Sequence, residues 1–263
     1  MIKSIVAQAI RSLSYCFSSN PAQKSLRIAS LLVGYLRGMG SGSSHHNLCG
    51  QVAFLRRLPD NAVIFDVGAN IGQFAELVLK SAKHVQLHSF EPSQKAFDQL
   101  KRTIGSKAVR INRCGLGDKE GEMTLYAPAP GSELASLTKR RLDHFGMLVG
   151  HSEKVQIDTV DAYCQRNSIF QINLLKVDVE GHEMTVFNGA RAMLAAGKIR
   201  TIIFEFGGAN IDTRTFFQDF HYFFKEFNAK SIGRLTPTGW EAQVLKYTED
   251  LECFRTSNYV VRF

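Results

Sequence analysis

The chain has 263 residues, of which 44% are hydrophobic, and a formal net charge of +8. This length allows one large domain or a domain with an appendage, and no apolar run approaches the roughly 20 residues of a membrane span. Five scattered cysteines without a CxxC pair argue against a disulfide framework or a cysteine-rich zinc site, so a reducing, cytoplasmic location is expected.

The positive charge is concentrated near the N-terminus. No Asp or Glu precedes Asp60, while residues 1–59 carry seven Lys and Arg residues, so the rest of the chain is close to neutral. A nucleic-acid-binding enzyme would need a basic stripe across its catalytic part. No nucleic-acid partner is therefore expected.

The N-terminal residues 1–50 predict a basic, amphipathic helical appendage. Apolar residues recur at helical spacing over 2–17, and Pro21 interrupts this pattern. A second helical stretch is predicted over 22–36, followed by a Gly/Ser-rich linker over 37–47.

Three roles for the appendage remain open. It could pack on the main domain, which is predicted over residues 51–263, or act as a targeting peptide because it is Ser-rich, basic and free of acids. It could also lie on a membrane surface through residues 1–40, which would make the protein peripheral to a membrane.

From Asn61 onward, short apolar strands alternate with amphipathic helices. The predicted elements, in chain order, are strand 62–68, helix 72–82, strand 85–92, helix 93–104 with Ser93 as N-cap, strand 108–118, an extended segment 121–128, strand then helix over 154–167, strand 172–181, helix 182–197, strand 199–206, helix 212–228, and strands 229–236 and 257–263. This alternation predicts an α/β fold, a parallel sheet with helices on both faces. Ligands of such folds bind beyond the carboxyl ends of the strands, where Asp66, Glu91, Asp178 and Glu205 lie.

The segment FDVGANIGQF predicts a strand, a tight turn and the start of a helix. Gly68 and Gly72 let the backbone approach a ligand, and Asn70 tolerates the positive φ of such a turn. The next strand ends in FEP, where Glu91 would accept hydrogen bonds from two ribose hydroxyls. A dinucleotide site stays open on this pattern. However, the loop is not GxGxxG, and Asp66 suits a cationic ligand, such as a sulfonium or an amino group, better than a pyrophosphate.

The segment NLLKVDVEGHE places ionisable residues at the end of a buried strand. If the strand continues to Glu180, Asp178 and Glu180 share one face, because side chains alternate along a strand. His182 would follow in the first turn of the next helix. We hypothesise that His182 is a general base, and that Asp178 or Glu180 orients it or holds a cationic cofactor.

Other roles for these residues stay open. Glu180 and Glu183 could cap the helix that begins near His182, and His182 could be structural. A divalent metal held by Asp178, Glu180 and Glu205 is chemically feasible, but no octahedral ligand set is evident, so no metal site is predicted. Lys176 is expected to be a strand residue with its ammonium group at the rim.

Taken together, the motifs resemble a known family. The segments VIFDVGANIGQF, SFEPSQKAFDQL, INRCGLGDKEG, IDTVDAY, LLKVDVEGHEMTVFNGA and IIFEF are similar, in this order, to the FkbM family of S-adenosylmethionine-dependent methyltransferases. The resemblance covers about residues 52–210. It implies the class I methyltransferase (Rossmann-like) fold, with a seven-stranded, mostly parallel sheet whose last strand, 257–263, is antiparallel. One departure is Cys114-Gly115, where the family more often has a small Ala before Leu.

By position, the resemblance implies the residues that contact the cofactor. They are Asp66, Gly68, Ala69, Asn70 and Gly72 around the methionine part, Glu91 with Pro92 at the ribose, Gly115 and Leu116 against the adenine, and Asp178 near the reacting centre. The implied cofactor is S-adenosyl-L-methionine, released as S-adenosyl-L-homocysteine.

The resemblance also implies the activity, which is O-methylation of a hydroxyl on a sugar, a glycan or a natural product. DVEG stands where methyltransferases of nucleobase amines usually carry an Asn/Asp-Pro-Pro-aromatic turn, which argues against such acceptors. Residues 127–152 would form a lid, an acceptor wall or a solvated loop, with Ser136, Lys139, Arg140, Arg141 and His144 as its polar residues. A membrane-associated methyltransferase of a lipid or glycolipid and a non-catalytic S-adenosylmethionine-binding module are the alternatives, and the oligomeric state is open.

Overall fold

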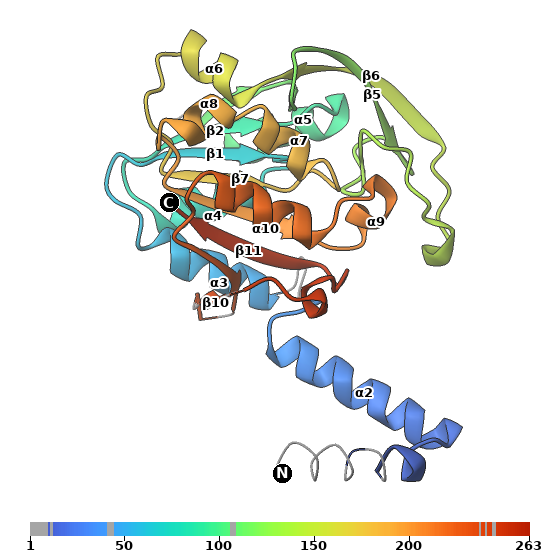
Figure 1. Cartoon of the computed structure of the whole chain (residues 1–263). Helices are drawn as coiled ribbons and strands as arrows, with labels where there is room; N and C mark the ends of the chain where they lie inside the picture. Colours follow the sequence, from blue (N-terminus) through green and yellow to red (C-terminus); the bar gives the residue numbers. More distant parts are fainter. Residues whose placement is uncertain are drawn as a thin grey trace.

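The computed structural model describes residues 10, 13–40, 45–105, 109–236, 238, 239, 241–243 and 246–263. An eight-stranded sheet forms its centre (Figure 1). The strands of this sheet are β1 (Val63–Val67), β2 (Gln86–Phe90), β3 (Val109–Asn112), β7 (Leu174–Val177), β8 (Thr201–Phe206), β9 (Ser231–Leu235), β10 (Glu241–Gln243) and β11 (Ser257–Arg262).

The strand order is β10-β9-β11-β8-β7-β1-β2-β3. Strands β3, β2, β1, β7 and β8 pair in parallel, and β11 pairs antiparallel with β8 and β9. This confirms the predicted class I sheet, including its antiparallel last strand. The short β10 adds an eighth strand at one edge, which the sequence did not indicate.

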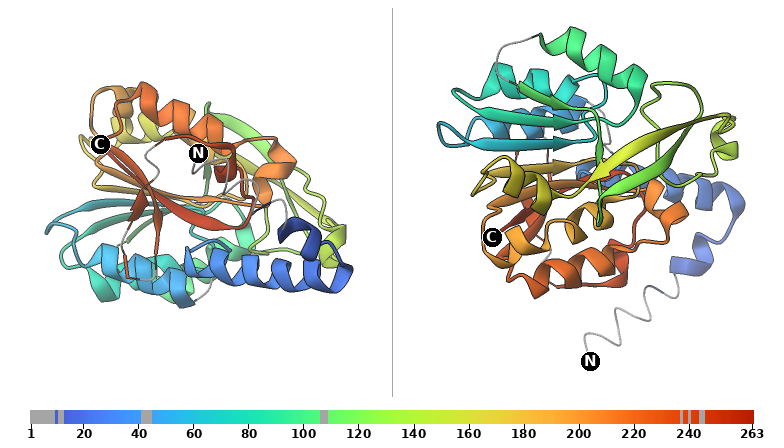
Figure 2. Two further views of the ribbon diagram at one scale, coloured as in Figure 1. Left: turned by 60° about the horizontal axis from the view of Figure 1, so that its bottom comes forward. Right: turned by 90° about the horizontal axis from the view of Figure 1, so that it is seen from above.

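Helices cover both faces of the sheet (Figure 2). One layer holds α3 (His45–Leu55), α4 (Gln73–Ser81) and α5 (Gln94–Ile104), and the other holds α6 (Val160–Arg166), α7 (Glu183–Asn188), α8 (Arg191–Ala195) and α10 (Phe217–Glu226). Alternate strand residues enter opposite cores. Ile64 and Leu174 join the core under the first layer, whereas Phe65 and Leu175 join the core under the second.

The predicted helix over 182–197 is broken in two. Helix α7 ends at Asn188 and α8 begins at Arg191. The break lies at Gly189, where a Cβ atom would overlap the carbonyl oxygen of Gly117. The Asp161 carboxylate then accepts hydrogen bonds from the first backbone N–H groups of α8, at Ala192 (2.8 Å) and Met193 (2.9 Å). Asp161 therefore caps α8 rather than its own helix.

A second, three-stranded sheet lies beside the main one. It contains β4 (Gly115–Leu116), β6 (His151–Asp158) and β5 (Gly121–Ala127), in the order β4-β6-β5. Between β5 and β6, the segment 128–150 is largely irregular and contains one 3₁₀ turn, η1 (Asp143–Phe145). We call this segment the excursion.

The N-terminal part differs from the prediction. Helix α2 (Asn20–Leu36) lies where a helix was predicted and projects from the body in Figure 1. Of the preceding predicted helix, residue 10 and residues 13–16 are described and are helical. However, His45 begins α3, so the predicted linker is partly helical and the predicted boundary at 50/51 falls inside a helix. Phe54 of α3 belongs to the core under α4. In the described part of the chain, no helix is long and apolar enough to cross a membrane.

Two helix starts give a matched pair of predictions. The Thr159 hydroxyl accepts a hydrogen bond from Ala162 N (3.0 Å) at the start of α6. The Ser93 hydroxyl, predicted to cap α5, makes no such bond and is buried without a hydrogen-bond partner among the described residues. We expect Thr159→Ala to lower the free energy of unfolding by about 1 kcal/mol, and Ser93→Ala to change it little. Urea denaturation would check both, and an equal loss in the two variants would contradict the difference in capping.

Candidate active site

Two cavities open at the carboxyl ends of the parallel strands. The larger has a volume of about 830 Å³, and its lining includes Lys176, Glu205, Arg140, His144 and Phe145. The narrower has a volume of about 70 Å³, and its lining includes Glu91, Pro92, Gly115, Leu116 and His182. Residues that line both are Gly68, Asn70, Glu133, Asp178 and Glu180. The cavities therefore meet at the β1–α4 turn and the β7–α7 loop.

The glycine turn after β1 has the positive φ angles that its sequence predicts. Gly68 has φ +78°, and a Cβ atom there would overlap the backbone oxygen of Asp178. Asn70 has φ 45° and lines both cavities, and its side-chain Oδ1 is buried without a hydrogen-bond partner in the described structure. Gly72 lines neither cavity, because it faces Leu100 and Ile104. Its role is therefore in the turn and in packing.

Glu91 follows β2 and is buried. Its Oε2 accepts a hydrogen bond from Asn70 N (2.8 Å), and its Oε1 accepts one from Ser93 N (2.8 Å). Burial raises the pKa of Glu91 to about 7, and these two hydrogen bonds offset part of the rise. Each carboxylate oxygen keeps a second acceptor site, so Glu91 can still accept hydrogen bonds from a ligand in the narrow cavity.

Lys176 is a buried centre of charge, contrary to its predicted place at the rim. Its Nζ lies 3.2 Å from Asp66 Oδ1 and 3.4 Å from Asp178 Oδ2. Burial alone would lower the pKa of Lys176, but the two carboxylates raise it above its usual value. Asp66 is fully buried and lines neither cavity, so it faces Lys176 rather than a bound cation. Asp66 can therefore act on a ligand only indirectly, through its ion pair with Lys176 and through its charge on Glu91.

The strand β7 ends at Val177, so the predicted alternation of Asp178 and Glu180 along a strand is wrong. Glu180 instead has φ 54° and Gly181 has φ 101°. The Glu183 carboxylate fixes this turn by accepting hydrogen bonds from Val179 N (3.2 Å), Gly181 N (3.0 Å) and Asn210 Nδ2 (3.1 Å). Side-chain bonds thus hold Glu180 in a left-handed conformation that is rare for a non-glycine residue.

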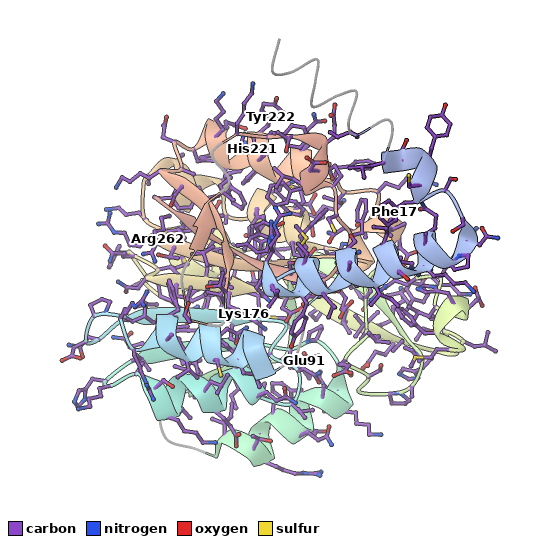
Figure 3. The ribbon with its side chains drawn as sticks, turned by 90° about the horizontal axis from the view of Figure 1, so that it is seen from below. Phe17, Glu91, Lys176, His221, Tyr222 and Arg262 are labelled. Carbon is purple, nitrogen blue, oxygen red and sulfur yellow. The ribbon has the colours of Figure 1, made fainter. Side chains whose placement is uncertain are left out.

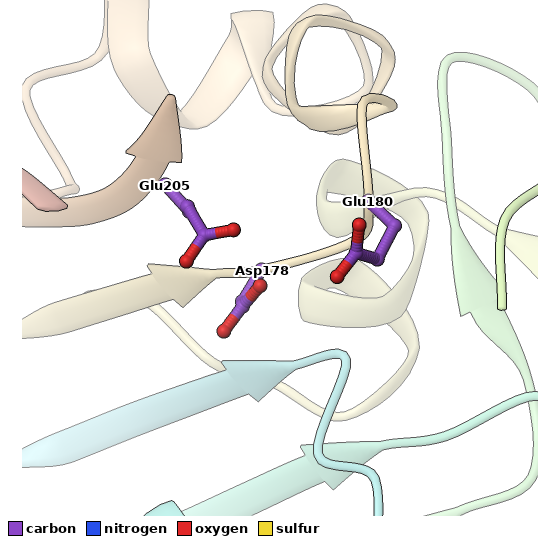
Figure 4. A group of neighbouring side chains, drawn as sticks. All are labelled: Asp178, Glu180 and Glu205. Atoms are coloured by element: carbon purple, nitrogen blue, oxygen red, sulfur yellow. The ribbon is translucent and has the colours of Figure 1, made fainter. Parts of the chain in front are cut away.

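Three carboxylates converge at the junction of the cavities. Oxygen atoms of Asp178, Glu180 and Glu205 lie within 4.8 Å of one another (Figure 4). Burial raises the pKa of Glu180 to about 8, and the neighbouring Asp178 adds to the rise. Burial also raises the pKa of Glu205 well above its usual range, reinforced by the negative charges of Asp178 and Glu180. This arrangement favours a proton, a cation or a basic group at the junction.

Arg140 ties the excursion to the junction. Its guanidinium forms ion pairs with Glu180 and with Asp212 (3.4 Å), which lies on α9 (Ala209–Thr213). The Ser136 hydroxyl also donates a hydrogen bond to the Glu180 carbonyl oxygen (2.8 Å). Of the predicted acceptor wall, Arg140, Arg141 and His144 line the larger cavity.

His182 lies on the other side of this junction. Its Nε2 is 2.9 Å from the Thr138 hydroxyl, and burial lowers its pKa. It lines the narrow cavity with Glu91, and it is not in the lining of the larger cavity. The residue occupies the N-cap position of α7 rather than its first turn. His182 is therefore close to Glu180 in the sequence, but it does not line the larger cavity.

The roles of three residues were not predicted from the sequence. Arg140 was one of several basic residues in an irregular segment, and nothing in the sequence paired it with Glu180. Glu183 was interpreted as a helix cap. For Lys176 a signal existed, because Asp66 occupies the matching position of the neighbouring strand in the paired register.

Comparisons with known proteins identify the family to which this chain is similar. The family model "Methyltransferase FkbM domain" matches residues 66–230, which include both cavities' central residues. Methyltransferase 1 of Beauveria bassiana is 29% identical over 149 residues, covering 50% of this chain and 59% of that protein. The 31-O-demethyl-FK506 methyltransferase FkbM of Streptomyces tacrolimicus is 30% identical, covering 48% of this chain and 58% of that protein. The chain thus spans a little over half the length of these relatives.

One further relative and one structure extend these comparisons. The 2-O-methyltransferase NoeI of Sinorhizobium fredii is 25% identical, covering 65% of this chain and 74% of that protein. A TehB-like methyltransferase from Corynebacterium glutamicum has a solved structure with a TM-score of 0.44 and 12% identity, covering 92% of this chain and 99% of that one.

Proposed function

The chain belongs to the FkbM methyltransferase family, and we propose that it binds S-adenosylmethionine and methylates a hydroxyl oxygen of an acceptor. The observation that carries this proposal is the meeting of two cavities at Asp178. The narrow cavity offers the carboxylate of Glu91, and the larger cavity offers room for an acceptor. The methyl group would be transferred where the two spaces join.

The residues of the narrow cavity suit this cofactor. Glu91 can accept hydrogen bonds from ribose hydroxyls, and the apolar side chains of Pro92 and Leu116 suit an adenine ring. The unpaired Asn70 Oδ1 can accept a hydrogen bond from an amino group. Asp178 at the junction favours a positive charge. Together these groups fit a ligand that carries a ribose at one end and a cation at the other.

The excursion borders the space that such a ligand would occupy. The narrow cavity has a volume of only about 70 Å³, against about 830 Å³ for the larger one. Ser136 and Leu137 of the excursion line the narrow cavity, and Arg140 forms an ion pair with Glu180, which lines both cavities. We therefore propose that these contacts open when the cofactor binds and close again to exclude water.

The transfer itself requires alignment and removal of one proton. When bound, S-adenosylmethionine would supply a methyl group on a positively charged sulfur; the sulfur–methyl bond would break, leaving its electrons on sulfur, as the acceptor oxygen bonds to the methyl carbon. The hydroxyl proton passes to a carboxylate of the junction. Among the described residues, Glu205 makes no side-chain hydrogen bond or ion pair, and burial raises its pKa, which makes its ionised carboxylate a stronger base. The hypothesis that His182 is the base stays untested. Glu205 lines the larger cavity and His182 does not, which favours Glu205.

Relatives suggest the class of acceptor. Their names describe a 2-O-methyltransferase, a 31-O-demethyl-FK506 methyltransferase and a hexuronic acid methyltransferase. We propose a sugar, a glycan or a natural-product hydroxyl for this chain. A divalent metal held by Asp178, Glu180 and Glu205 is the alternative to a carboxylate base, and chelator sensitivity of turnover would separate the two.

Glu91→Ala tests the cofactor site. The substitution removes an acceptor for two hydroxyl hydrogen bonds, so we expect S-adenosylhomocysteine to bind more weakly by about 1.5–3 kcal/mol, or roughly 10- to 150-fold. Isothermal titration calorimetry measures this directly.

Glu91→Gln provides the control for loop damage. Glu91 also accepts backbone bonds from Asn70 and Ser93, and Gln keeps one acceptor for them. We expect an intermediate loss of affinity in this variant. If both variants fold and bind S-adenosylhomocysteine as tightly as the parent, the assignment of Glu91 to the ribose is wrong.

A further inference from the structure

The N-terminal arm turns its apolar side away from the catalytic body. We define the arm as the described residues 10 and 13–40, which include α2. Gly34 is the buried residue of α2, and it faces Arg255 of the body. The carbonyl oxygen of Arg37 accepts a hydrogen bond from Arg234 (2.8 Å). The arm is therefore attached to the body near its C-terminal end.

The opposite side of α2 carries large apolar side chains. Ile28, Leu32 and Leu36 recur every four residues and so lie along one side of the helix. Their exposed fractions are 60%, 61% and 81%. Gly34 is two residues from both Leu32 and Leu36, which places it about 200° around the helix from them. A surface helix normally buries its apolar stripe against its own protein. Because this stripe is exposed, we expect another molecule to cover it.

The apolar exposure continues beyond α2. Leu13, Tyr15 and Phe17 precede the helix and are also exposed, and Phe17 lies beside the start of α2 in Figure 3. In the arm as described, the exposed large hydrophobic residues are Ile10, Leu13, Tyr15, Phe17, Leu26, Ile28, Leu31, Leu32, Val33, Tyr35 and Leu36. Such a continuous set exceeds the scattered single hydrophobic residues of an ordinary surface.

The charge of residues 1–59 indicates what kind of surface would cover the apolar stripe of α2. Residues 1–59 carry seven Lys and Arg residues and no acid, and α2 and its end contribute Lys24, Arg27 and Arg37. Lys24 lies one turn before Ile28 and extends the row of Ile28, Leu32 and Leu36. An apolar stripe that ends in a basic residue, in a segment without acids, matches the interface of a bilayer with anionic headgroups. A second copy of the chain would instead bring two acid-free basic segments together. Charge thus favours a lipid surface over self-association.

The arm also joins the body at the mouth of the larger cavity. Gly40, at the end of the arm, lines this cavity, as do Leu48 and Gln51 of α3. Exposed Phe145 and Ile211 line it as well. A surface that receives the arm would therefore lie close to the opening through which an acceptor enters.

We propose that the arm docks the protein on an anionic membrane surface, with Ile28, Leu32 and Leu36 in the interface and the basic side chains on the headgroups. Docking itself is independent of methyl transfer. A second consequence rests on the proposed function: docking would place the larger cavity beside the headgroups, where an acceptor carried by a lipid could reach it.

Vesicle sedimentation with the full chain tests the proposal. The probes are phosphatidylcholine vesicles with and without phosphatidylserine. We expect binding to the phosphatidylserine vesicles that weakens as salt rises. The triple substitution Ile28→Ser, Leu32→Ser and Leu36→Ser should reduce this binding by at least about tenfold. The triple substitution Lys24→Gln, Arg27→Gln and Arg37→Gln should reduce it by about 100-fold, at roughly fivefold per charge.

Two matched controls separate the arm from general surface effects. Phe170→Ser removes an equally exposed hydrophobic residue that precedes β7, at the opposite end of the sheet. Lys119→Gln, Lys198→Gln and Lys230→Gln remove the same charge from exposed positions of the body. We expect both to sediment with vesicles like the parent. Unchanged S-adenosylhomocysteine affinity in the arm variants would show that they fold.

Several outcomes would overturn docking. The proposal is wrong if the parent stays in the supernatant, or if the arm variants bind vesicles as tightly as the parent. It is also wrong if the parent does not bind vesicles but forms a dimer in sedimentation equilibrium and the triple serine variant is a monomer. The stripe would then be a dimer interface. None of these readouts depends on methyl transfer, so a failure here leaves the proposed function intact.

Discussion

Replacing Lys176 with methionine is expected to lower the free energy of unfolding by about 3–5 kcal/mol. The side chain of Lys176 is only 7% exposed and that of Asp66 is fully buried, and their charged atoms lie 3.2 Å apart. Removing the ammonium group would leave the Asp66 carboxylate charged, buried and without a cation. Urea denaturation at neutral pH measures the loss.

The loss should depend on pH. Burial raises the pKa of Asp66 above its ordinary 3.8, and Lys176 offsets part of that rise. Without Lys176, the folded-state pKa of Asp66 rises further above its unfolded value. A group with a raised folded pKa destabilises the fold once it ionises, so the deficit is largest at neutral pH and above. It should shrink as the pH falls and Asp66 becomes protonated in the folded protein.

Two further variants isolate the buried pair. Combining Lys176→Met with Asp66→Asn removes both charges, and we expect most of the lost stability to return. Lys80→Met breaks the exposed pair of Lys80 with Glu76 (3.4 Å) and should cost less than about 1 kcal/mol. A Lys176→Met protein with the parent's urea midpoint at neutral pH would refute the role given to this pair.

The main sheet could be predicted from the sequence because its signals are local. Each strand of β1, β2, β7 and β8 is a short apolar run followed by a turn, and alternation with helices implies parallel order. The break between α7 and α8 could not be predicted, because it depends on the meeting of Gly189 with Gly117, which is distant in sequence. Strand β10 is too short to have a signal of its own.

In the candidate site, too, residues with a local sequence signal could be predicted, whereas contacts between distant residues could not. Gly68, Asn70, Glu91 and Asp178 stand out in the sequence because residues of these types, at strand ends, have few other uses. Arg140 and Glu180 meet only because the excursion folds back over the β7–α7 loop, and an irregular segment carries no periodicity from which to predict its path. His182 was grouped with the carboxylates because it is near them in the sequence. In the structure, a turn with positive φ at Glu180 and Gly181 precedes His182, which lines the narrow cavity.

The assignment of the base gives the second large expected effect. Glu205→Gln removes a proton acceptor from the larger cavity and should lower turnover by about 10²-fold or more. The affinity for S-adenosylhomocysteine should stay nearly unchanged, because Glu205 does not line the narrow cavity. Release of S-adenosylhomocysteine, measured over a panel of sugar and natural-product hydroxyl acceptors, gives the turnover.

The pH profile distinguishes Glu205 from His182. Burial raises the pKa of Glu205, and the neighbouring Asp178 and Glu180 add to the rise, so the rate should rise with pH through an apparent pKa that belongs to the group of carboxylates. Glu180→Gln removes one ionisable neighbour and should shift the profile to lower pH. His182→Ala should keep the profile and retain turnover within about tenfold, since the histidine lines only the narrow cavity. If His182→Ala instead abolishes the pH dependence while Glu205→Gln keeps full turnover, the histidine is the base.

Loss of turnover with a chelator, restored by Mg²⁺ or Mn²⁺, would instead assign the three carboxylates to a metal.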